Sequence, residues 1–371
     1  MVTRPPAAAL DAHLVVHRGA FTLDLRLAIA LGETVALLGP NGAGKTTAVL
    51  CLAGLLPLAA GHIRLGDRTL DDPAQRVFVP PEDRRAGVVF QDYLLFPHLT
   101  GVVFQDYLLF PHLSAADNVS FGPRSRGRSR AEARRVALDW LEHFDLQGLA
   151  DIPSRRLSGG QAQQVAMARA LAAGPDLLLL DEPLAALDVT TRARLRRSLA
   201  AHLAAFAGPR LLITHSPTGG FLLADRIVVL EEGRATQEGT PDEIRRHPRT
   251  AYAADLAGVN LLPGTCRDDT VTLEGGLTWR LGTPAADGPV LLTVHPRAVS
   301  LLPGASPPEG AANAWRAEVA AVEPLGERTR VQLASPIPLV AELATVDAAG
   351  LARGTRVWAV VAPADVTAQP G

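Results

Sequence analysis

One short stretch, 39–47, constrains the fold of this chain more than any other. It reads Gly-Pro-Asn-Gly-Ala-Gly-Lys-Thr-Thr and matches the phosphate-binding pattern G-x-x-x-x-G-K-[ST]. An apolar run, 34–38, precedes it, and an apolar segment, 48–56, follows and predicts a helix. Glycines let the backbone wrap around an anion, and the start of a helix adds positive potential there. The sequence therefore predicts a strand, a phosphate-binding loop and a helix in succession.

The lysine of this loop, Lys45, is the only lysine among 371 residues. A compact ammonium fits a nest of backbone N–H groups where a planar guanidinium does not. We expect Lys45 to contact the β- and γ-phosphates of a nucleotide, and the hydroxyl of Thr46 to ligate Mg²⁺. The predicted nucleotide-binding residues of the loop are Gly39, Pro40, Asn41, Gly42, Ala43, Gly44, Lys45, Thr46 and Thr47.

Two further apolar runs end in polar side chains. The run 177–180 precedes Asp181 and Glu182, and the run 211–213 precedes Thr214 and His215. Such runs are typical of central strands in a parallel sheet, whose carboxyl ends bind ligands. We expect Asp181 to hold Mg²⁺ through water, Glu182 to act as general base or to position water, and His215 to contact the γ-phosphate. The alternatives are a solvated turn for the carboxylates and a structural role for the histidine.

A second candidate anion site precedes another predicted helix. Ser158, Gly159, Gly160 and Gln161 place a cap residue and two glycines where backbone N–H groups can face an anion. Alone, a Ser-Gly-Gly sequence predicts only a loop. Further along the chain, Asp188 lies in the turn after the strand predicted over 177–180.

A tandem duplication interrupts the chain. Residues 87–100 and 101–114 are identical except for the last position, which is threonine in the first copy and serine in the second. Only one copy can occupy a position in the sheet, so either Gln91 or Gln105 takes the functional place. Because an upstream surface loop tolerates extra residues well, we favour Gln105.

Arginine recurs between residues 124 and 135, just before and within a helix that begins with a Ser-x-x-Glu capping box at Ser129. A solvated face explains this run most simply, and contact with an acidic partner is the alternative. Beyond residue 259, short alternating segments separated by Gly, Pro and Asp predict a small all-β domain, a barrel.

Composition limits the classes of partner and compartment. With 36 basic and 38 acidic residues the net charge is −2, so no overall field attracts nucleic acid or acidic lipid. The two cysteines cannot form a disulfide framework, and we expect two buried thiols. No apolar run approaches the ~20 residues that a membrane-spanning helix needs, and the N-terminus lacks the pattern of a signal peptide. We expect a cytosolic protein that meets a membrane only through a partner.

Taken together, these motifs resemble the ATP-binding subunits of ABC transporters over residues 14–247. They are 39–47, Gln91 or Gln105, 157–161, 177–182, 187–188 and His215, in that order. The resemblance implies ATP and Mg²⁺ as cofactors, with Gln91 or Gln105 touching the metal and the attacking water. It implies a homodimer in which Ser158, Gly160 and Gln161 of one copy close over the ATP of the other. It also implies two integral membrane permease subunits, a periplasmic or lipid-anchored solute-binding protein, a peripheral location at the cytoplasmic face of the membrane, and no nucleic acid.

Within that family the chain is similar to the ATPases of molybdate importers. The likeness rests on the duplicated segment, on 158–163, on 258–261 and on a C-terminal segment, about 308–369, similar to their oxyanion-binding module. That module's pattern is matched at Asn313 and altered at Ala311, Ala312 and Ala362. Val16 stands where an aromatic residue often stacks on adenine, with His17 or Phe21 as substitutes.

We therefore expect an α/β P-loop ABC-type nucleotide-binding domain over 1–247, with a helical subdomain over about 114–165. A linker over 248–262 and an OB-like β regulatory domain over 263–371 follow. The expected function is ATP hydrolysis that powers import of molybdate or a related oxyanion. The alternatives are an importer of sulfate, ferric iron or another small solute, a non-transport ABC ATPase, and a protein uncoupled from transport by the duplication.

Overall fold

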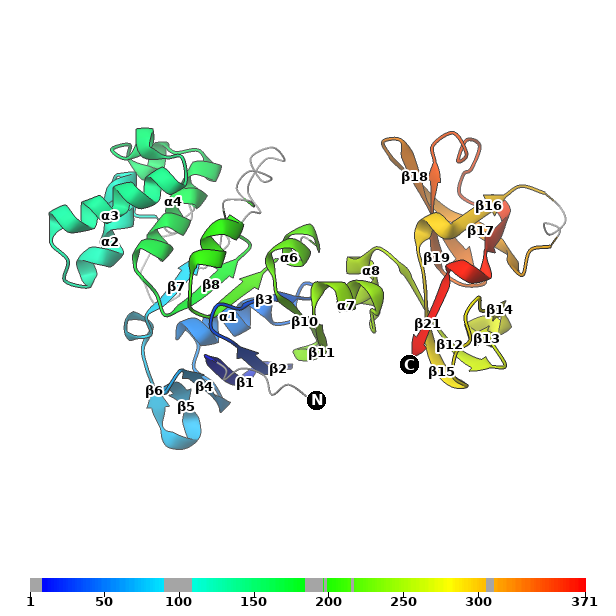
Figure 1. The fold of residues 1–371 in the computed structure, drawn as a ribbon, viewed down its shortest axis with the longest axis horizontal. Helices are drawn as coiled ribbons and strands as arrows, with labels where there is room; N and C mark the ends of the chain where they lie inside the picture. Colours follow the sequence, from blue (N-terminus) through cyan, green and yellow to red (C-terminus); the bar gives the residue numbers. More distant parts are fainter. Residues whose placement is uncertain (1–8, 90–108, 184–195, 197–198, 215–216, 305–309) are drawn as a thin grey trace. The chain divides into compact units, whose positions relative to one another are not determined.

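The chain divides into two compact units in the computed structural model, Met1–Pro241 and Asp242–Gly371 (Figure 1). The structure describes residues 9–89, 109–183, 196, 199–214, 217–304 and 310–371. In these ranges no helix has both the length and the apolar character needed to cross a bilayer.

A six-stranded sheet forms the centre of the first unit, in the order β11-β10-β3-β9-β8-β7. All neighbouring pairs are parallel except β10 with β11, the hairpin at one edge. Every residue of β3, β8 and β9 is buried, which explains why these strands read as continuous apolar runs. The strands are β3 (Thr34–Leu38), β7 (Ala86–Val89), β8 (Leu177–Asp181), β9 (Arg210–Ile213), β10 (Arg226–Glu231) and β11 (Arg234–Gly239).

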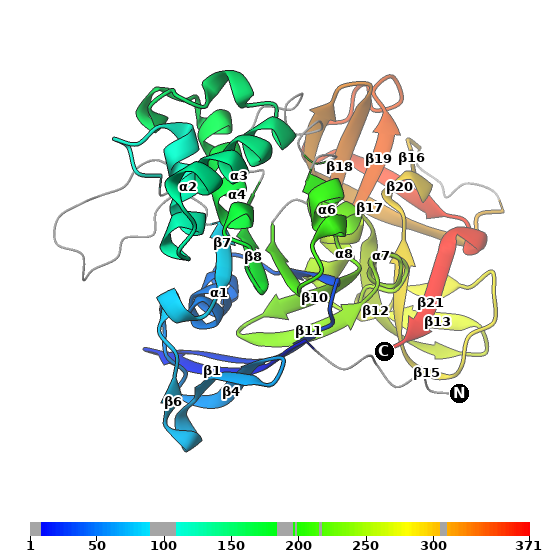
Figure 2. The ribbon, with the colours of Figure 1, turned by 60° about the vertical axis from the view of Figure 1, so that its left-hand side comes forward.

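A second, antiparallel sheet carries the N-terminal hairpin, in the order β2-β1-β4-β5-β6. Along β2 the leucines at 23, 25 and 27 are buried and the residues between them are exposed, in keeping with the alternation of apolar and polar residues in this segment, which is typical of a half-buried strand. Helix α1 (Lys45–Ala53) shares one apolar core with both sheets, and Figure 2 shows it between β1 and β4 on one side and β7 and β8 on the other. The strands are β1 (Leu10–Arg18), β2 (Phe21–Ile29), β4 (Ala60–Leu65), β5 (Arg68–Asp72) and β6 (Val77–Phe78).

Arg84 joins three segments of this unit from inside the core. Its side chain is fully buried and donates hydrogen bonds to the carbonyl oxygens of Val79 (2.7 Å), Cys51 (2.6 Å), Leu52 (3.2 Å) and Leu70 (3.3 Å). Its Nη2 also lies 3.6 Å from Oδ2 of Asp71. The C-terminal end of α1 is therefore fixed to β5 and to the segment that leads into β7.

Three helices pack together after the duplicated segment: α2 (Ala115–Ser125), α3 (Arg130–His143) and α4 (Gly159–Ala172). Serine caps all three, and the predicted capping box at Ser129 is present with both of its hydrogen bonds. The short helix α6 (Pro217–Leu223) contacts β3.

The second unit contains helix α7 (Pro241–Arg246) from its second residue onward, then α8 (Ala251–Ala257), and continues as two five-stranded antiparallel sheets. Residues 248–262, our expected linker, thus include α8 and the start of β12. Trp279 and Trp315 pack together in the core, with ring centroids 5.0 Å apart. The strands are β12 (Asn260–Arg267), β13 (Thr270–Leu273), β14 (Thr278–Arg280), β15 (Gly288–Val294), β16 (Val299–Leu302), β17 (Asn313–Leu325), β18 (Arg328–Ser335), β19 (Leu339–Ala344), β20 (Arg356–Val361) and β21 (Val366–Pro370).

Candidate functional site

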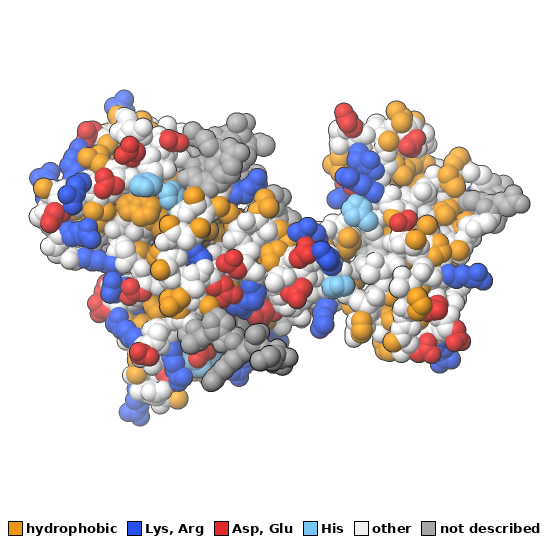
Figure 3. Space-filling view, in the orientation of Figure 1, with side chains coloured by type: hydrophobic (Ala, Val, Ile, Leu, Met, Phe, Trp, Pro, Cys, Tyr) orange, Lys and Arg blue, Asp and Glu red, His pale blue; other side chains and the backbone are white. Residues whose placement is uncertain are grey.

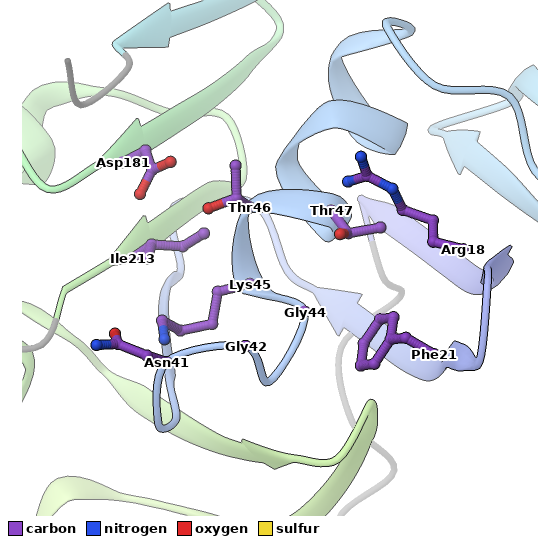
Figure 4. Close-up of a pocket in the computed structure, with 10 residues that line it drawn as sticks. All are labelled: Arg18, Phe21, Asn41, Gly42, Gly44, Lys45, Thr46, Thr47, Asp181 and Ile213. Atoms are coloured by element: carbon purple, nitrogen blue, oxygen red, sulfur yellow. The ribbon is translucent and has the colours of Figure 1, made fainter. Parts of the chain in front are cut away.

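A cavity of about 440 Å³ lies at the carboxyl ends of the central strands of the first unit, where open α/β sheets bind ligands (Figure 4). The loop 39–44 forms one wall, the end of β8 another, and residues from the β1–β2 hairpin a third. The lining residues are Arg18, Phe21, Asn41, Gly42, Gly44, Lys45, Thr46, Thr47, Asp181 and Ile213.

Glycine is required in the loop because of close backbone approach and positive φ. A Cβ on Gly39 would lie 2.1 Å from the carbonyl oxygen of Leu230 in β10, which no side chain tolerates. Gly42 and Gly44 have φ values of 82° and 107°, in the left-handed region that other residues avoid. These conformations direct the loop around the cavity and start α1 at Lys45, three residues earlier than predicted.

Lys45 is 8% exposed and donates from Nζ to the carbonyl oxygens of Gly39 (2.7 Å) and Pro40 (2.9 Å). Burial lowers the pKa of its ammonium, and the nearby carboxylates of Glu182 and Asp181 oppose that shift. The single lysine of the chain is thus held inside the loop and lines the cavity.

The two predicted carboxylates lie at the end of β8, as expected. Asp181 is 5% exposed and lines the cavity, and Glu182 is 4% exposed with φ of 51°. A backbone hydrogen bond from Glu182 N to Ile213 O (2.9 Å) holds this turn against β9. Gln163 of α4, which we had not assigned a role, donates from Nε2 to the carbonyl oxygen of Glu182 (3.2 Å). Because Gln163 follows Gln161 by two residues, the Ser-Gly-Gly-Gln-Ala-Gln sequence was the available signal.

Comparison with known proteins agrees with this geometry. Residues 23–185 match the family model described as ABC transporter, and residues 310–368 match the TOBE domain. The chain is 42% identical over 364 residues to the molybdenum import ATP-binding protein ModC of Mycobacterium tuberculosis, covering 94% of both chains. It is 39% identical to the sulfate/thiosulfate import ATP-binding protein CysA 2 of Chromobacterium violaceum, over 88% of this chain and 85% of that one. It is 35% identical to the Fe(3+) ions import ATP-binding protein FbpC 1 of Rhizobium meliloti, over 82% and 83%.

The chain belongs to the ATP-binding subunits of ABC transporters. We therefore call the cavity bounded by Lys45 and Asp181 the candidate ATP site of this subunit. The fold class predicted from the sequence, a P-loop domain followed by an OB-like β domain, is confirmed.

The hairpin side of the ATP site of this subunit carries Phe21 and Arg18, one aromatic and one cationic side chain (Figure 4). Phe21 lies so close to the loop that a Cβ on Gly44 would be 2.8 Å from its Cζ. Val16 is buried, and His17, our other substitute for an adenine-stacking residue, bonds Thr22 Oγ1 through Nδ1 (3.1 Å) and does not line the cavity. Phe21 is therefore the only aromatic side chain among the described residues that lines the ATP site.

Ser158, Gly159, Gly160 and Gln161 do not line the cavity of their own ATP-binding subunit. They form the first turn of α4 and its cap. Ser158 Oγ accepts from Gln161 N (3.4 Å), and Gln161 Oε1 accepts from Ser158 N (3.0 Å). Ser158 and Gly159 are exposed, so this turn faces outward from the subunit.

Four predicted site residues lie outside the described residues: Gln91, Gln105, Asp188 and His215. The strands that precede them are described. β7 ends at Val89, β8 at Asp181 and β9 at Ile213.

Proposed function

We propose that this subunit hydrolyses ATP to power the import of molybdate or a related oxyanion. The observation that carries the proposal is the 42% identity to a molybdenum import ATP-binding protein along 94% of both chains, which covers the ATP site and the C-terminal unit together. The relatives named for sulfate/thiosulfate and Fe(3+) import are less similar to this chain, and those solutes are the alternative cargoes. As the family resemblance implies, the subunit would work with two membrane permease subunits and a solute-binding protein, as a peripheral protein at the cytoplasmic face.

The residues of the cavity fit Mg·ATP. The exposed hydroxyl of Thr46 and the carboxylate of Asp181 line the same cavity, and hydroxyl, carboxylate and water oxygens are the ligands that Mg²⁺ prefers. Bound Mg²⁺ supplies charge neutralisation on the β- and γ-phosphates. Lys45 and the N–H groups of the loop bind the same phosphates, and the carboxylate of Glu182 orients the attacking water and accepts its proton. His215 is proposed to contact the γ-phosphate, and Asp188 to lie beside the nucleotide of the closed dimer.

A second copy of the chain would complete the site. The turn at Ser158 carries backbone N–H groups and a hydroxyl, yet it is absent from the cavity of its own chain. We propose that Ser158, Gly159, Gly160 and Gln161 of one copy close over the ATP of the other, with Ser158, Gly160 and Gln161 contacting its γ-phosphate. Glu182→Gln protein should become dimeric with saturating Mg·ATP in light-scattering chromatography, and Glu182→Gln with Ser158→Arg should not. A monomer at saturation in the first variant would contradict the proposal.

The described ends of the duplicated segment bear on the choice of glutamine. The first copy supplies Gly87, Val88 and Val89 of β7, and Asp176 N donates to Arg85 O (2.8 Å) immediately before it. The second copy supplies Phe110, whose carbonyl accepts from Ser154 Oγ (2.7 Å) in the helical subdomain. Contrary to our first preference for Gln105, we propose that Gln91 is the functional residue, because it lies two positions after the end of β7. Gln91→Ala should then lower ATPase activity much more than Gln105→Ala.

Excision tests whether the duplication has a role of its own. Deleting 87–100 or deleting 101–114 gives proteins that differ only in the residue that caps α2, serine in the first and threonine in the second. Both residues cap helices well, so the two shortened proteins serve as controls for each other. We expect both to retain ATPase activity. Loss of activity in both, with the full chain active, would show that the extra copy is needed.

The cargo and the coupling require the membrane partners. ATPase activity should rise when the subunit is reconstituted with its permease and a molybdate-loaded binding protein. Equal stimulation by sulfate- or iron-loaded protein would favour the other importers. ATPase activity that does not change when the permease is added would identify an uncoupled protein. Co-purification with nucleic acid in place of a permease would identify a non-transport ATPase.

A further inference from the structure

The turn between α2 and α3 concentrates positive charge that the ATP site does not use. Residues 124–135 contain six arginines and one acidic residue, Glu132, in a chain whose net charge is −2. We call Arg124, Arg128, Arg130 and Arg135 the arginine tip. All four side chains are exposed, and Figure 3 shows Lys and Arg side chains gathered over α2 and α3.

The backbone of the turn is hydrogen-bonded internally and exposed to solvent. Gly127 N donates to Arg124 O (3.0 Å), and Arg128 N donates to Pro123 O (3.2 Å). Gly127 has φ of 83°, and a Cβ placed on it would meet nothing within 4 Å. The turn therefore holds a fixed shape while it faces open space.

The four side chains of the tip form no hydrogen bond or ion pair within the described residues, and two of them, Arg128 and Arg135, are attracted by Glu132 only at longer range. The other two arginines of the run are engaged: Arg126 donates to Gly174 O (2.5 Å), and Arg134 pairs with Asp151 (2.7 Å). Glu132 is committed to the capping box, where its bonds to Ser129 lower the pKa of its carboxyl group. Four guanidinium groups that repel one another, one of them at the positive end of α3, do not stabilise the isolated fold.

The residues between these arginines in the sequence indicate which class of partner the tip can bind. Between residues 124 and 135 the other side chains are serine, glycine, alanine and one glutamate. Protein interfaces depend on buried aromatic and large apolar anchors, and this run has none. A layer of phosphate groups needs no such anchor, because guanidinium binds phosphate through paired hydrogen bonds and charge.

We propose that the arginine tip binds the phosphate groups of an anionic phospholipid surface. The proposal rests on the proposed function, which brings the subunit to a membrane. The overall charge of −2 does not attract the subunit to an anionic membrane. The contact would therefore be local to the tip, and it would orient the subunit on the membrane as well as hold it there. An exposed arginine near an anionic bilayer contributes an attraction that falls away within a Debye length, so salt weakens it.

The test is binding of the full chain to phosphatidylcholine vesicles with and without phosphatidylglycerol. The tip variant carries Arg→Gln at all four tip positions. A matched control carries Arg→Gln at four exposed arginines of the second unit: Arg267, Arg280, Arg353 and Arg356. Both variants lose the same charge. We expect wild type and control to bind only the anionic vesicles, and the tip variant to bind about tenfold or more weakly.

Equal binding by the tip variant and the control would overturn the proposal. So would tip-dependent binding to poly(U) RNA that anionic vesicles do not displace. ATPase activity of the same preparations separates the two proposals. Normal activity without tip-dependent vesicle binding removes only the lipid contact, whereas absence of ATP hydrolysis in wild type removes the proposed function whatever the vesicles show.

Discussion

Replacing Arg84 with methionine should destabilise the first unit strongly without touching the ATP site. The change removes four hydrogen bonds to backbone carbonyls and leaves Asp71, 2% exposed, without its cationic neighbour. Asp71 then keeps only the N–H of Leu58 as a described hydrogen-bond donor, at 3.3 Å. Methionine fills much of the space of the arginine stem, so lost polar contacts dominate the effect.

The magnitude follows from the burial of the pair. Breaking a buried ion pair by removing one partner costs about 3–5 kcal/mol. Domains are stable by about 5–15 kcal/mol, so the loss is a large fraction of the total. For a domain of this size 1 kcal/mol shifts Tm by about 2–4 °C, so we expect Tm of the first unit to fall by about 6–20 °C.

The pH dependence has a defined sign. Burial already raises the pKa of Asp71 in the wild type, while Leu58 N–H and Arg84 oppose that rise. Without Arg84 the folded-state pKa rises further above its unfolded value. A carboxyl group with a raised folded pKa disfavours the fold at higher pH, and that cost disappears as pH falls through the raised pKa. The stability deficit of the variant should therefore narrow as pH falls.

Each unit contains one buried thiol, which allows the effect to be located. Cys51 lies in α1 and Cys266 in β12, both 0% exposed, and burial raises the pKa of Cys51 to about 12. Iodoacetamide should alkylate each thiol only when its unit opens. In Arg84→Met protein, mass spectrometry of the peptides should show faster alkylation of Cys51 and an unchanged rate at Cys266.

The adjacent arginine is the control. Arg85 pairs with Asp176 at the surface (3.2 Å), with about half of each side chain exposed, and Arg85→Met should cost less than about 1 kcal/mol. Asp71→Asn added to Arg84→Met should recover part of the loss, because no unpaired charge remains. If Arg84→Met and Arg85→Met lower Tm equally, or if Cys51 and Cys266 react alike, our reasoning about the buried pair is wrong.

Three further predictions concern the ATP site. Lys45→Met should lower ATPase activity by about 10²-fold or more, because a charge that stabilises the transferred phosphoryl group is lost. Its Tm should stay the same or rise, because a buried ammonium is removed. A fall in Tm equal to that of Arg84→Met would contradict this prediction. Phe21→Ala should weaken ATP binding by about 1–3 kcal/mol of lost base stacking and leave inorganic triphosphate binding unchanged in calorimetry, and an equal loss for both ligands would disprove the stacking role. Gly39→Ala should abolish nucleotide binding, because its Cβ would lie 2.1 Å from Leu230 O; binding within a few-fold of wild type would show that the loop can move away.

Much of the first unit was predictable because its signals are local. Continuous apolar runs marked β3, β8 and β9, and alternation marked the β1–β2 hairpin. The helix predicted over 48–56 ends earlier, at Ala53, because Gly54 caps it in the left-handed conformation with φ of 81°. The carboxylates of Asp181 and Glu182 were placed correctly at the end of β8, because the carboxyl end of a parallel strand fixes where the residues there lie.

Other features depend on contacts between distant segments. The burial of Arg84 requires α1, β5 and β6 to assemble around it, and an Arg-Arg dipeptide in the sequence does not reveal which residue turns inward. The hydrogen bond from Gln163 to Glu182 links α4 to the end of β8, and the Ser-Gly-Gly-Gln-Ala-Gln sequence marks the glutamine but does not reveal this contact. The choice of Phe21 over His17 depended on which side of the hairpin faces the loop, and alternation alone does not give that.

The scarcity of lysine has a practical consequence for the chemistry of this molecule. All its other fixed cations are guanidinium groups, which amine-directed reagents leave untouched. Within this sequence, succinimidyl esters have a single lysine ε-amine to acylate, the one that lines the candidate ATP site. A lysine-specific endoprotease likewise has one peptide bond to cut, between Lys45 and Thr46. If a bound nucleotide protects this bond, the fraction of uncut chain on a gel after digestion reports the occupancy of the nucleotide pocket.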